Sequence, residues 1–368
     1  MNTSLSMKAI LHAFALLAAI GFEQRALADE DTYRVTELRD ITNQAHVGTV
    51  RAEHLNNMSE IIGSSTDASG TLRPTFWHHF RATDLHAAYN QQIDAVNGLN
   101  DRSEVVGSGP GGLVFLRHGK AETLMNSGAA LNGSLPVLNN RGEIAYFLQV
   151  SDMLFDSFYW FNGSLSTVSG TDDFNFVNAI NTAGVMCGSS GHDTRAGSGN
   201  PPAWVSTGNN GTQLAVIPPL PGDTAVGAID INDSNQVVGA SSIATSDDSF
   251  RFRAYLWQDG VASDLLMTLA GDQNSVPTAI NNSTVIVGWS GAASAALNAS
   301  RAVIWHNGTT RELTAQIAAT DPLKRYVKLY TAKDINDAGE ILAQGVDTRT
   351  GKEHAYFLRP MRLPNINP

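Results

Sequence analysis

Seven copies of one short motif recur along the 368-residue chain, and this repeat restricts the possible folds more than any other feature. Each copy has an apolar residue, an asparagine, two turn-forming residues, a variable or glycine position, and then an apolar stretch. A period of about 40 to 50 residues is typical of the four-stranded blades of a β-propeller. The seven asparagines, which we call the anchor asparagines, are Asn56, Asn100, Asn139, Asn181, Asn232, Asn281 and Asn336, with spacings of 44, 39, 42, 51, 49 and 55 residues.

Each copy predicts a tight hairpin followed by two further strands. Asparagine and aspartate bond their own backbone and tolerate a left-handed conformation, and Gly142, Gly184 and Gly339 supply a residue with positive φ. A second apolar or aromatic segment follows in each copy, as at residues 254–257. In several copies this segment runs through a short turn ending in glycine into another strand, as at 257–265. Each copy therefore predicts four strands.

The two ends of the chain are expected to share one blade. The last copy stops at Pro360 without an outer strand, whereas residues 33–38 form a strand that no copy uses. We expect this N-terminal strand to complete the seventh blade and to remove open sheet edges. An open β-solenoid is the alternative, but its usual coil is shorter than this period. The sequence thus predicts an all-β, seven-bladed β-propeller closed by an N-terminal strand, with residues 29–368 as a single domain.

The N-terminus has the pattern of a secretory signal peptide. A basic residue precedes an apolar run over 9–22, which is short for a bilayer span, and a small-residue cleavage signal follows. Residues 1–28 are therefore predicted to be a signal peptide, the mature chain to begin at Asp29, and the protein to be secreted or periplasmic. The start residue, Met1 or Met7, stays open. No second apolar run reaches the roughly 20 residues of a membrane helix, so no membrane anchor is expected.

Charge and cysteine content narrow the partners and the chemistry. Lys and Arg total 24 against 35 Asp and Glu, a formal charge of −11, so no broad basic face is expected to bind nucleic acid. The single cysteine, Cys187, allows no intramolecular disulfide and is predicted to be a buried strand thiol. No nucleophile-elbow serine, zinc-protease, phosphate-loop or dinucleotide fingerprint occurs. We expect a monomer without a cofactor, stabilised by packing.

Two copies carry a known pattern. They read Ala-Ile-Asp-Ile-Asn at 228–232, Val-Val-Gly at 237–239 and Arg-Ala-Tyr-Leu-Trp at 253–257, and Ala-Lys-Asp-Ile-Asn at 332–336 and His-Ala-Tyr-Phe at 354–357. They resemble the HAF family of extracellular repeat proteins, and the resemblance covers nearly the whole mature chain. Copies one, three and four depart from it, for example by Ser59 in place of a turn glycine. The resemblance implies export and a propeller-like repeat fold, but no single activity and no catalytic residues.

Polar residues at two positions of each inner strand are the candidates for a site. The strand that leads into each anchor asparagine is expected to be innermost, so the residues two and three before that asparagine should face the central channel. A ring of polar side chains that only hydrates the channel is the favoured interpretation, because Asp before Ile-Asn belongs to the repeat itself. The candidate catalytic residues are His54, Glu53, Lys333 and Asp334, which ring closure brings together for acid–base chemistry; the candidate binding residues are Asn97, Asn178 and Asp230.

Two motifs that look like metal sites have simpler explanations. The runs that start at Asp230 and Asp334 resemble calcium loops, but they lack the alternating oxygen ligands and the bidentate glutamate. His78 and His79 are adjacent, so on a strand they point to opposite faces and cannot share one metal ion. Residues 76–80 are interpreted as surface turn residues. No metal site is predicted.

The sequence supports two functions of different classes. The favoured one is a binding or interaction module that recognises an extracellular glycan, peptide or surface partner through loops on one face. The alternative is a secreted polysaccharide-degrading enzyme, a lyase or a hydrolase, with a histidine and carboxylate site at the channel mouth. The absence of a catalytic motif favours binding, since only analogy of fold supports the enzyme.

Overall fold

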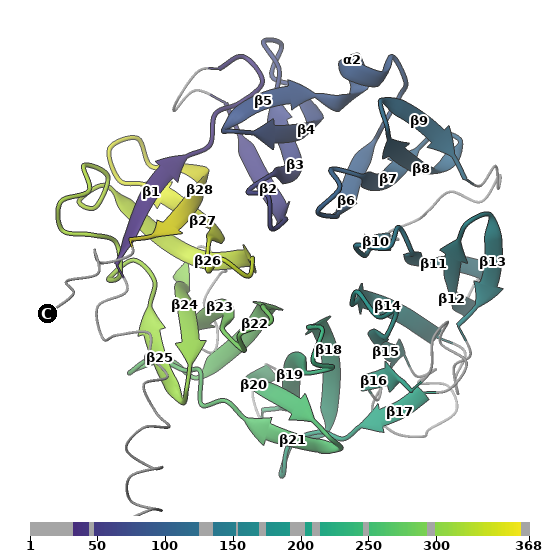
Figure 1. The fold of residues 1–368 in the computed structure, drawn as a ribbon. Coiled ribbons are helices and arrows are strands. Elements are labelled where there is room, and N and C mark those ends of the chain that lie inside the picture. The colour runs from purple at the N-terminus through teal and green to yellow at the C-terminus, as the bar shows by residue number, and fades with distance from the viewer. Residues whose placement is uncertain are drawn as a thin grey trace, which may run out of the picture.

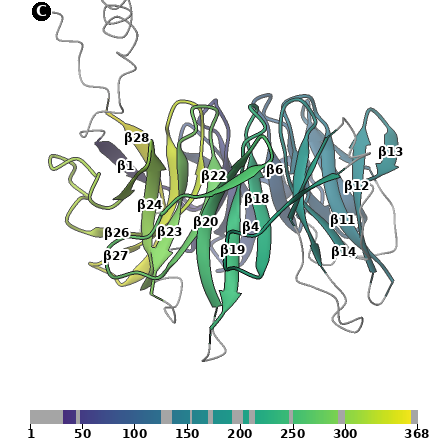
Figure 2. The same cartoon turned by 90° about the horizontal axis from the view of Figure 1, so that it is seen from below.

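Seven four-stranded antiparallel blades are arranged around a central channel as in a propeller, as Figure 1 shows along the channel and Figure 2 from the side. The predicted signal peptide and Asp29 lie outside the described residues. Within the described residues, no helix has the length and hydropathy of a bilayer-spanning segment. The computed structural model describes residues 32–43, 48–124, 135–151, 154–168, 174–191, 203–207, 214–245, 250–292 and 299–361.

In the first four blades the strands follow one another from the channel outwards, in chain order. One short helix, α2 (Leu85–Tyr89), joins the first blade to the second, and a single parallel pair between residues 155 and 174 joins the third to the fourth. The strands are β2 (Val50–Leu55), β3 (Ile61–Thr66), β4 (Leu72–His78) and β5 (Arg81–Asp84); β6 (Ala95–Leu99), β7 (Val105–Gly109), β8 (Gly112–Arg117) and β9 (Lys120–Thr123); β10 (Val137–Leu138), β11 (Ile144–Ser151), β12 (Leu154–Phe161) and β13 (Ser164–Thr167); β14 (Phe174–Ile180), β15 (Met186–Gly191), β16 (Ala203–Ser206) and β17 (Leu214–Ile217).

The last three blades have the same order, except that the outermost strand of the seventh comes from the N-terminus. The innermost strands β2, β6, β10, β14, β18, β22 and β26 surround the channel (Figure 1). The strands are β18 (Ala225–Ile231), β19 (Val237–Ala244), β20 (Phe250–Gln258) and β21 (Val261–Asp264); β22 (Asn274–Ile280), β23 (Ile286–Gly291), β24 (Arg301–His306) and β25 (Thr309–Glu312); β26 (Val327–Ile335), β27 (Ile341–Asp347), β28 (Lys352–Pro360) and β1 (Tyr33–Glu37).

Strand β1 pairs antiparallel with β28, with Tyr33 opposite Pro360 and Glu37 opposite Tyr356. In Figure 1 it is the purple strand beside yellow β28. Tyr33, Val35 and Leu38 are only 3%, 8% and 1% exposed, so this segment contributes to the core as well as to the sheet. The outer edge of β1 is covered in part by residues 316–321, where the Tyr33 N–H donates to the Gln316 carbonyl at 2.9 Å.

All seven copies of the anchor turn adopt the same backbone shape. The third residue after each anchor asparagine has a positive φ, including Gly142, Gly184 and Gly339, as the sequence predicted. Non-glycine residues adopt the same conformation in the other four copies, so the missing glycine changes the strain and not the turn. These residues are Ser59, Ser103, Asn235 and Thr284, with φ between 58° and 59°.

The core lies between neighbouring blades. In the last seam, Val287 and Ile304 of the sixth blade belong to the same cluster as Leu329 of the seventh. Cys187 is fully buried and burial raises the pKa of its thiol, which agrees with a packing role. The interpretation of residues 76–80 as surface turn residues is wrong for Trp77, which is fully buried in β4 and donates its indole N–H to the Arg39 carbonyl at 2.7 Å.

A glycine in the second strand of most blades allows the inner strand to come close. A Cβ on Gly107 would lie 2.1 Å from the Ala95 carbonyl oxygen, and one on Gly239 would lie 2.1 Å from that of Gly227. The equivalent position is Tyr146 in the third blade, where β10 pairs over two residues only, and Ala343 in the seventh, where β26 has a second register shift. In the other five blades the glycine therefore allows a close backbone approach, which a side chain would prevent as long as the inner strand keeps its register.

Candidate functional site

Two adjacent residues of most inner strands reach the channel because these strands carry a β-bulge. In six of the seven, the pairing register shifts at the residue three before the anchor asparagine. The extra residue breaks the alternation of the strand, so consecutive side chains can face the same side. Asn97 and Gly98 of β6, and Lys333 and Asp334 of β26, are two such pairs that line the channel.

Six of the seven candidate residues line one cavity of about 150 Å³ inside the channel. Glu53 lies outside this lining, but its Oε2 accepts a hydrogen bond from Lys333 Nζ at 2.9 Å. Ring closure therefore brings candidate residues of the first and seventh blades together. The cavity is smaller than the roughly 300 to 1,000 Å³ that small-molecule sites usually offer. The six lining residues are His54, Asn97, Asn178, Asp230, Lys333 and Asp334.

The two aspartates of the cavity bind the backbone of the neighbouring blade. Asp334 of β26 accepts the N–H of Leu55 in β2 at 2.8 Å, and Asp230 of β18 accepts the N–H of Ile280 in β22 at 2.9 Å. The second oxygen of each carboxylate accepts the N–H of the following residue at 2.8 Å. Both carboxylates therefore connect two blades, which gives them a structural role independent of any ligand.

Two other polar side chains of the cavity also bond across blades. The Asn178 amide donates to the Ala228 carbonyl at 2.7 Å, and the Thr278 hydroxyl donates to the Ala332 carbonyl at 2.9 Å. Asn97 differs, because its buried Oδ1 has no hydrogen-bond partner in the part of the chain that the structure describes. Most of the polar groups in the cavity are thus already used by inter-blade bonds.

His54 is the candidate base that faces the cavity most openly. Its Nδ1 lies 3.6 Å from Asp334 Oδ2, beyond hydrogen-bonding distance, and its side chain is 46% exposed. Burial lowers the pKa of His54, but the carboxylates of Asp334, Glu53 and Asp230 outweigh this effect and raise the pKa above 6.5. The imidazole therefore favours its charged form more than an ordinary histidine does.

Asp230 is the second group with an altered charge. Burial raises its pKa to about 7 and the nearby Asp334 adds to the increase, while the N–H of Ile280 and the charge of His54 oppose it. An acid and a histidine that both titrate near neutrality are the components that acid–base catalysis needs. The same carboxylate, however, holds two backbone N–H groups.

The raised pKa of Asp230 gives a pH dependence of stability that can be measured. The folded protein holds the Asp230 proton more tightly than the unfolded chain does, so raising the pH from about 4 to about 7 removes a proton that favours folding. Relative to Asp230→Asn, the wild type should therefore lose up to about 4 kcal/mol of unfolding free energy over this range. Urea unfolding at several pH values checks this.

The matched control for this experiment is Asp259→Asn, because Asp259 is an exposed aspartate in the turn between β20 and β21. The unfolding free energy of Asp259→Asn should change with pH in the same way as that of the wild type. Parallel profiles for the wild type and Asp230→Asn would contradict the assignment of a raised pKa to this carboxyl group.

The anchor asparagines form a closed ring of hydrogen bonds at one mouth of the channel. The Nδ2 amide of each donates to the backbone carbonyl of the next anchor at 2.8–3.1 Å, and Asn336 donates back to Asn56. The Oδ1 of Asn56 accepts the N–H groups of Met58 and Glu60 within its own turn, and all seven are 2–5% exposed. Each asparagine thus shapes its turn and also connects two blades.

The sequence interpretation assigned these asparagines to turns only and missed their role between blades. The available signal was the residue type, because all seven positions carry Asn and none carries Asp or Ser. A turn alone needs an acceptor, which Asp and Ser also provide, whereas a bond to the next carbonyl needs a donor as well.

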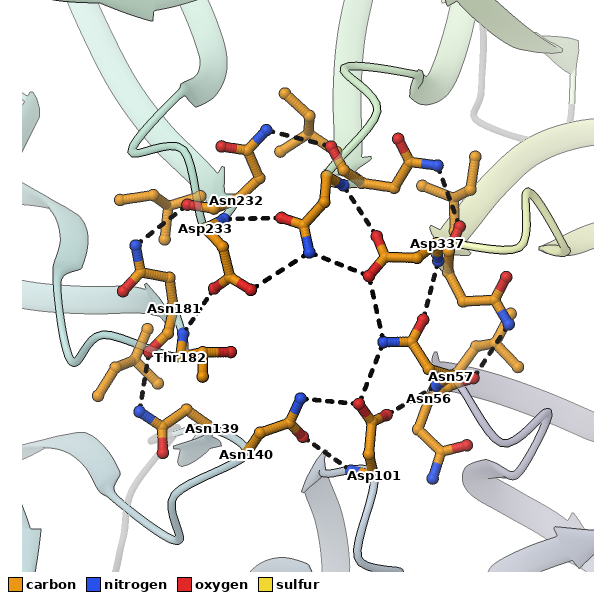
Figure 3. Close-up of a pocket in the computed structure, with 18 of the residues that line it drawn as sticks. Asn56, Asn57, Asp101, Asn139, Asn140, Asn181, Thr182, Asn232, Asp233 and Asp337 are labelled. Atoms are coloured by element: carbon orange, nitrogen blue, oxygen red, sulfur yellow. Dashed lines mark hydrogen bonds between the residues drawn. The ribbon is translucent and has the colours of Figure 1, made fainter.

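The residues that follow the anchor asparagines form a second ring, which lines a hollow of about 180 Å³ (Figure 3). Six backbone N–H groups donate to a side-chain oxygen of the next blade, among them that of Asp337, which donates to Asn57 Oδ1 at 2.8 Å, so these bonds cross six of the seven seams. Asparagine amides bond the aspartate carboxylates, for example Asn140 to Asp101 at 2.7 Å. The ring consists of Asn57, Asp101, Asn140, Thr182, Asp233, Asn282 and Asp337.

Amide–carboxylate bonds explain the aspartates of this ring without a metal ion. Among the residues that the structure describes, no three His, Cys, Asp or Glu side chains are arranged to hold a metal. His78 lies apart from the channel sites, with its Nδ1 3.1 Å from Glu60 Oε1. Among the described residues, the channel lining therefore offers hydrogen-bonding groups, the ammonium group of Lys333 and one histidine, His54.

No family model and no curated protein matches this chain. The resemblance to the HAF family therefore rests on the motifs alone.

Several solved structures are similar to this chain over most of its length. An acylaminoacyl peptidase from Pyrococcus horikoshii has a TM-score of 0.53 at 10% identity, over 89% of this chain and 54% of that one. A puromycin-hydrolysing peptidase from Mycobacterium tuberculosis has a TM-score of 0.52 at 12% identity, over 90% and 54%. The extracellular domain of a putative one-component system from B. thetaiotaomicron has 0.52 at 8%, over 90% and 40%.

The chain spans about half the length of the two peptidases and less of the third protein. At these identities the similarity concerns the fold alone. Together with the seven blades described above, it makes this chain a seven-bladed β-propeller.

Proposed function

We propose that the protein is a secreted or periplasmic β-propeller that serves as a binding module for an extracellular glycan, peptide or surface partner. The leader-like pattern of residues 1–28 and the resemblance to extracellular repeat proteins support export. In this proposal the leader is removed before Asp29 and β1 then holds the ring closed, as a monomer without a cofactor or metal.

The proposal rests on the hydrogen bonds and ion pairs that the channel side chains already make. Asp230, Asp334, Asn178 and Lys333 are engaged in bonds or ion pairs, three of them across blade seams to backbone groups. The cavity that they line holds about 150 Å³, too little for a segment of a polymer chain. In this proposal the partner therefore binds elsewhere, on the faces or in clefts between blades.

The alternative is a polysaccharide-degrading enzyme that uses His54. In its favour, the imidazole faces the channel beside Asp334 and has a raised pKa. Against it, the cavity is small and the neighbouring carboxylates are occupied by backbone N–H groups. We therefore give preference to binding.

A screen of the exported protein distinguishes the two functions. We expect binding to members of an array of neutral and acidic polysaccharides and peptides, with neither unsaturated products nor new reducing ends. His54→Ala should leave binding within about twofold, because the proposed contacts lie outside the channel. An enzyme that used His54 would instead lose about 10²- to 10⁴-fold in rate.

Asn97→Ala, a second change in the same cavity, is the control for general damage to the channel. Turnover that disappears in His54→Ala but persists in Asn97→Ala would establish the enzyme and overturn the binding proposal. The absence of any bound ligand or protein in the array would also overturn it.

A further inference from the structure

A cleft of about 530 Å³ lies at the seam where the ring closes, between β1 and the turn that joins β4 to β5. In Figure 1 this is the region between purple β1 and the first blade. Its volume is within the range that small-molecule sites offer. The residues that matter for its chemistry are Arg39, Asn43, His79, Phe80, Arg81 and Arg349.

The walls of the cleft come from three distant parts of the chain and are held by buried contacts. Arg39 follows β1, and its carbonyl accepts the indole N–H of buried Trp77 at 2.7 Å. His79 and Phe80 form the β4–β5 turn with φ values of 48° and 63°, and the Phe80 ring packs edge-on against Phe357 at 5.0 Å. The cleft is therefore a feature of the closed ring.

Three guanidinium groups meet in this cleft, although the chain carries a formal charge of −11. Arg349 is oriented by Asp347, with Nη2 2.6 Å from Oδ2, and its guanidinium lies 4.5 Å from the centre of the Tyr326 ring. Arg39 and Arg81 are exposed, and neither side chain has a hydrogen bond or ion pair within the described residues. Two unpaired guanidinium groups thus face a cleft beside a third that is fixed in position.

The only carboxylate in the described lining of the cleft is Glu37, whose side chain is 8% exposed and lies 3.4 Å from His354 Nδ1. Asp347 pairs with Arg349, so the unpaired positive charge of the cleft belongs to Arg39 and Arg81. A guanidinium binds a planar carboxylate through two parallel hydrogen bonds. The charge and the geometry both favour a ligand that carries carboxylates.

The shape of the seam favours a sugar ring over an extended peptide. A peptide would bind most simply by adding a strand to the outer edge of β1. That edge is already used, because the Val35 N–H donates to Asp321 at 2.9 Å and the Ala318 N–H donates to the Tyr33 carbonyl at 2.9 Å. The Phe80 ring and the Asn43 amide instead offer an aromatic surface and hydrogen bonds to a ring with hydroxyl groups.

We propose that this cleft is the binding site for the carboxylates of an acidic polysaccharide of the uronate type. This inference rests on the proposed function, since it assigns the extracellular partner and the site. Arg39 and Arg81 bind the carboxylates, and Arg349, fixed by Asp347, adds a third positive group beside them. The bound ligand contacts both the first and the seventh blade. Binding consequently stabilises the closed ring.

The test uses the whole mature chain and galacturonate oligomers of three to six units, with neutral oligomers of the same length as a comparison. Calorimetry should show binding of the uronates and a rise in melting temperature that the neutral sugars do not produce. Arg39→Gln and Arg81→Gln should each weaken binding by roughly 10- to 100-fold, and the affinity should fall with salt.

Arg34→Gln is the matched control, because it removes the same charge from an exposed position of β1 outside the cleft lining. It should leave uronate affinity within about twofold. Melting temperatures without ligand show whether each variant is folded. Equal affinity for the wild type and the Arg39→Gln/Arg81→Gln double variant would overturn the proposal, as would binding of polyglutamate without binding of uronates.

The failure of this inference is distinguishable from the failure of the proposed function. If uronates do not bind but another glycan or protein of the array does, the assignment of the cleft is wrong and the binding module stands. If no ligand or protein binds at all, both are wrong.

Discussion

Deletion of residues 32–38 is expected to lower the melting temperature by roughly 10 °C or more and to cause aggregation. The deletion removes a strand paired with β28 over five residues. It also removes Tyr33, Val35 and Leu38, which are at most 8% exposed and contribute about 1.5–3 kcal/mol each. The loss is comparable with the whole stability of an ordinary domain. Thermal unfolding and light scattering measure it.

The control for this deletion is Arg34→Ala, which changes an exposed side chain of the same strand and keeps its backbone bonds. Its melting temperature should stay within a few degrees of that of the wild type, because such a surface substitution changes the unfolding free energy by only about 0.5 kcal/mol. An unchanged melting temperature and solubility after the deletion would show that β1 does not hold the ring closed.

Gly107→Ala should destabilise the protein by roughly 3–5 kcal/mol. Its new Cβ would lie 2.1 Å from the Ala95 carbonyl oxygen and 3.1 Å from the Val96 Cα, so strand β6 would have to move away from β7. This movement would break ladder hydrogen bonds and displace Asn97, whose bulge lies at the same place. Urea denaturation measures the change in unfolding free energy.

A glycine of the same blade provides the matched control. A Cβ on Gly111 would meet only the Thr123 side chain, at 3.4 Å, which is ordinary contact. Gly111→Ala should therefore change the unfolding free energy by less than about 0.5 kcal/mol. Similar effects of the two substitutions would mean that the inner strand adapts and that the close approach does not require glycine.

Local patterns in the sequence were sufficient to predict most of the fold. The seven-fold recurrence of apolar-Asn-turn segments predicted the number of blades, and Gly142, Gly184 and Gly339 have the positive φ expected of them. These features depend on residues that are neighbours in sequence, so their physics is visible without the tertiary structure. The same holds for the burial of Cys187, which lies in an apolar strand.

The candidate site shows where local patterns are insufficient. Counting back from the anchor asparagines identified His54, Asn97, Asp230 and Lys333 as channel residues, and all four line the cavity. Their position in the repeat did not determine whether their side chains are available to a ligand. The structure shows that Asp230 holds the N–H of Ile280 in the next blade, a residue 50 positions away.

The sequence by itself thus determined the turns, the strands and the residues that face the channel, because these follow from alternation and turn chemistry within one repeat. Only the tertiary structure decided which polar groups remain available. Asn336 meets Asn56 across 280 residues, and Arg39, Arg81 and Arg349 meet in one cleft only because the ring closes. Hydrogen bonds and charge pairs depend on distances of a few ångströms in space, and the repeat pattern contains no information about which blades become neighbours at the closing seam.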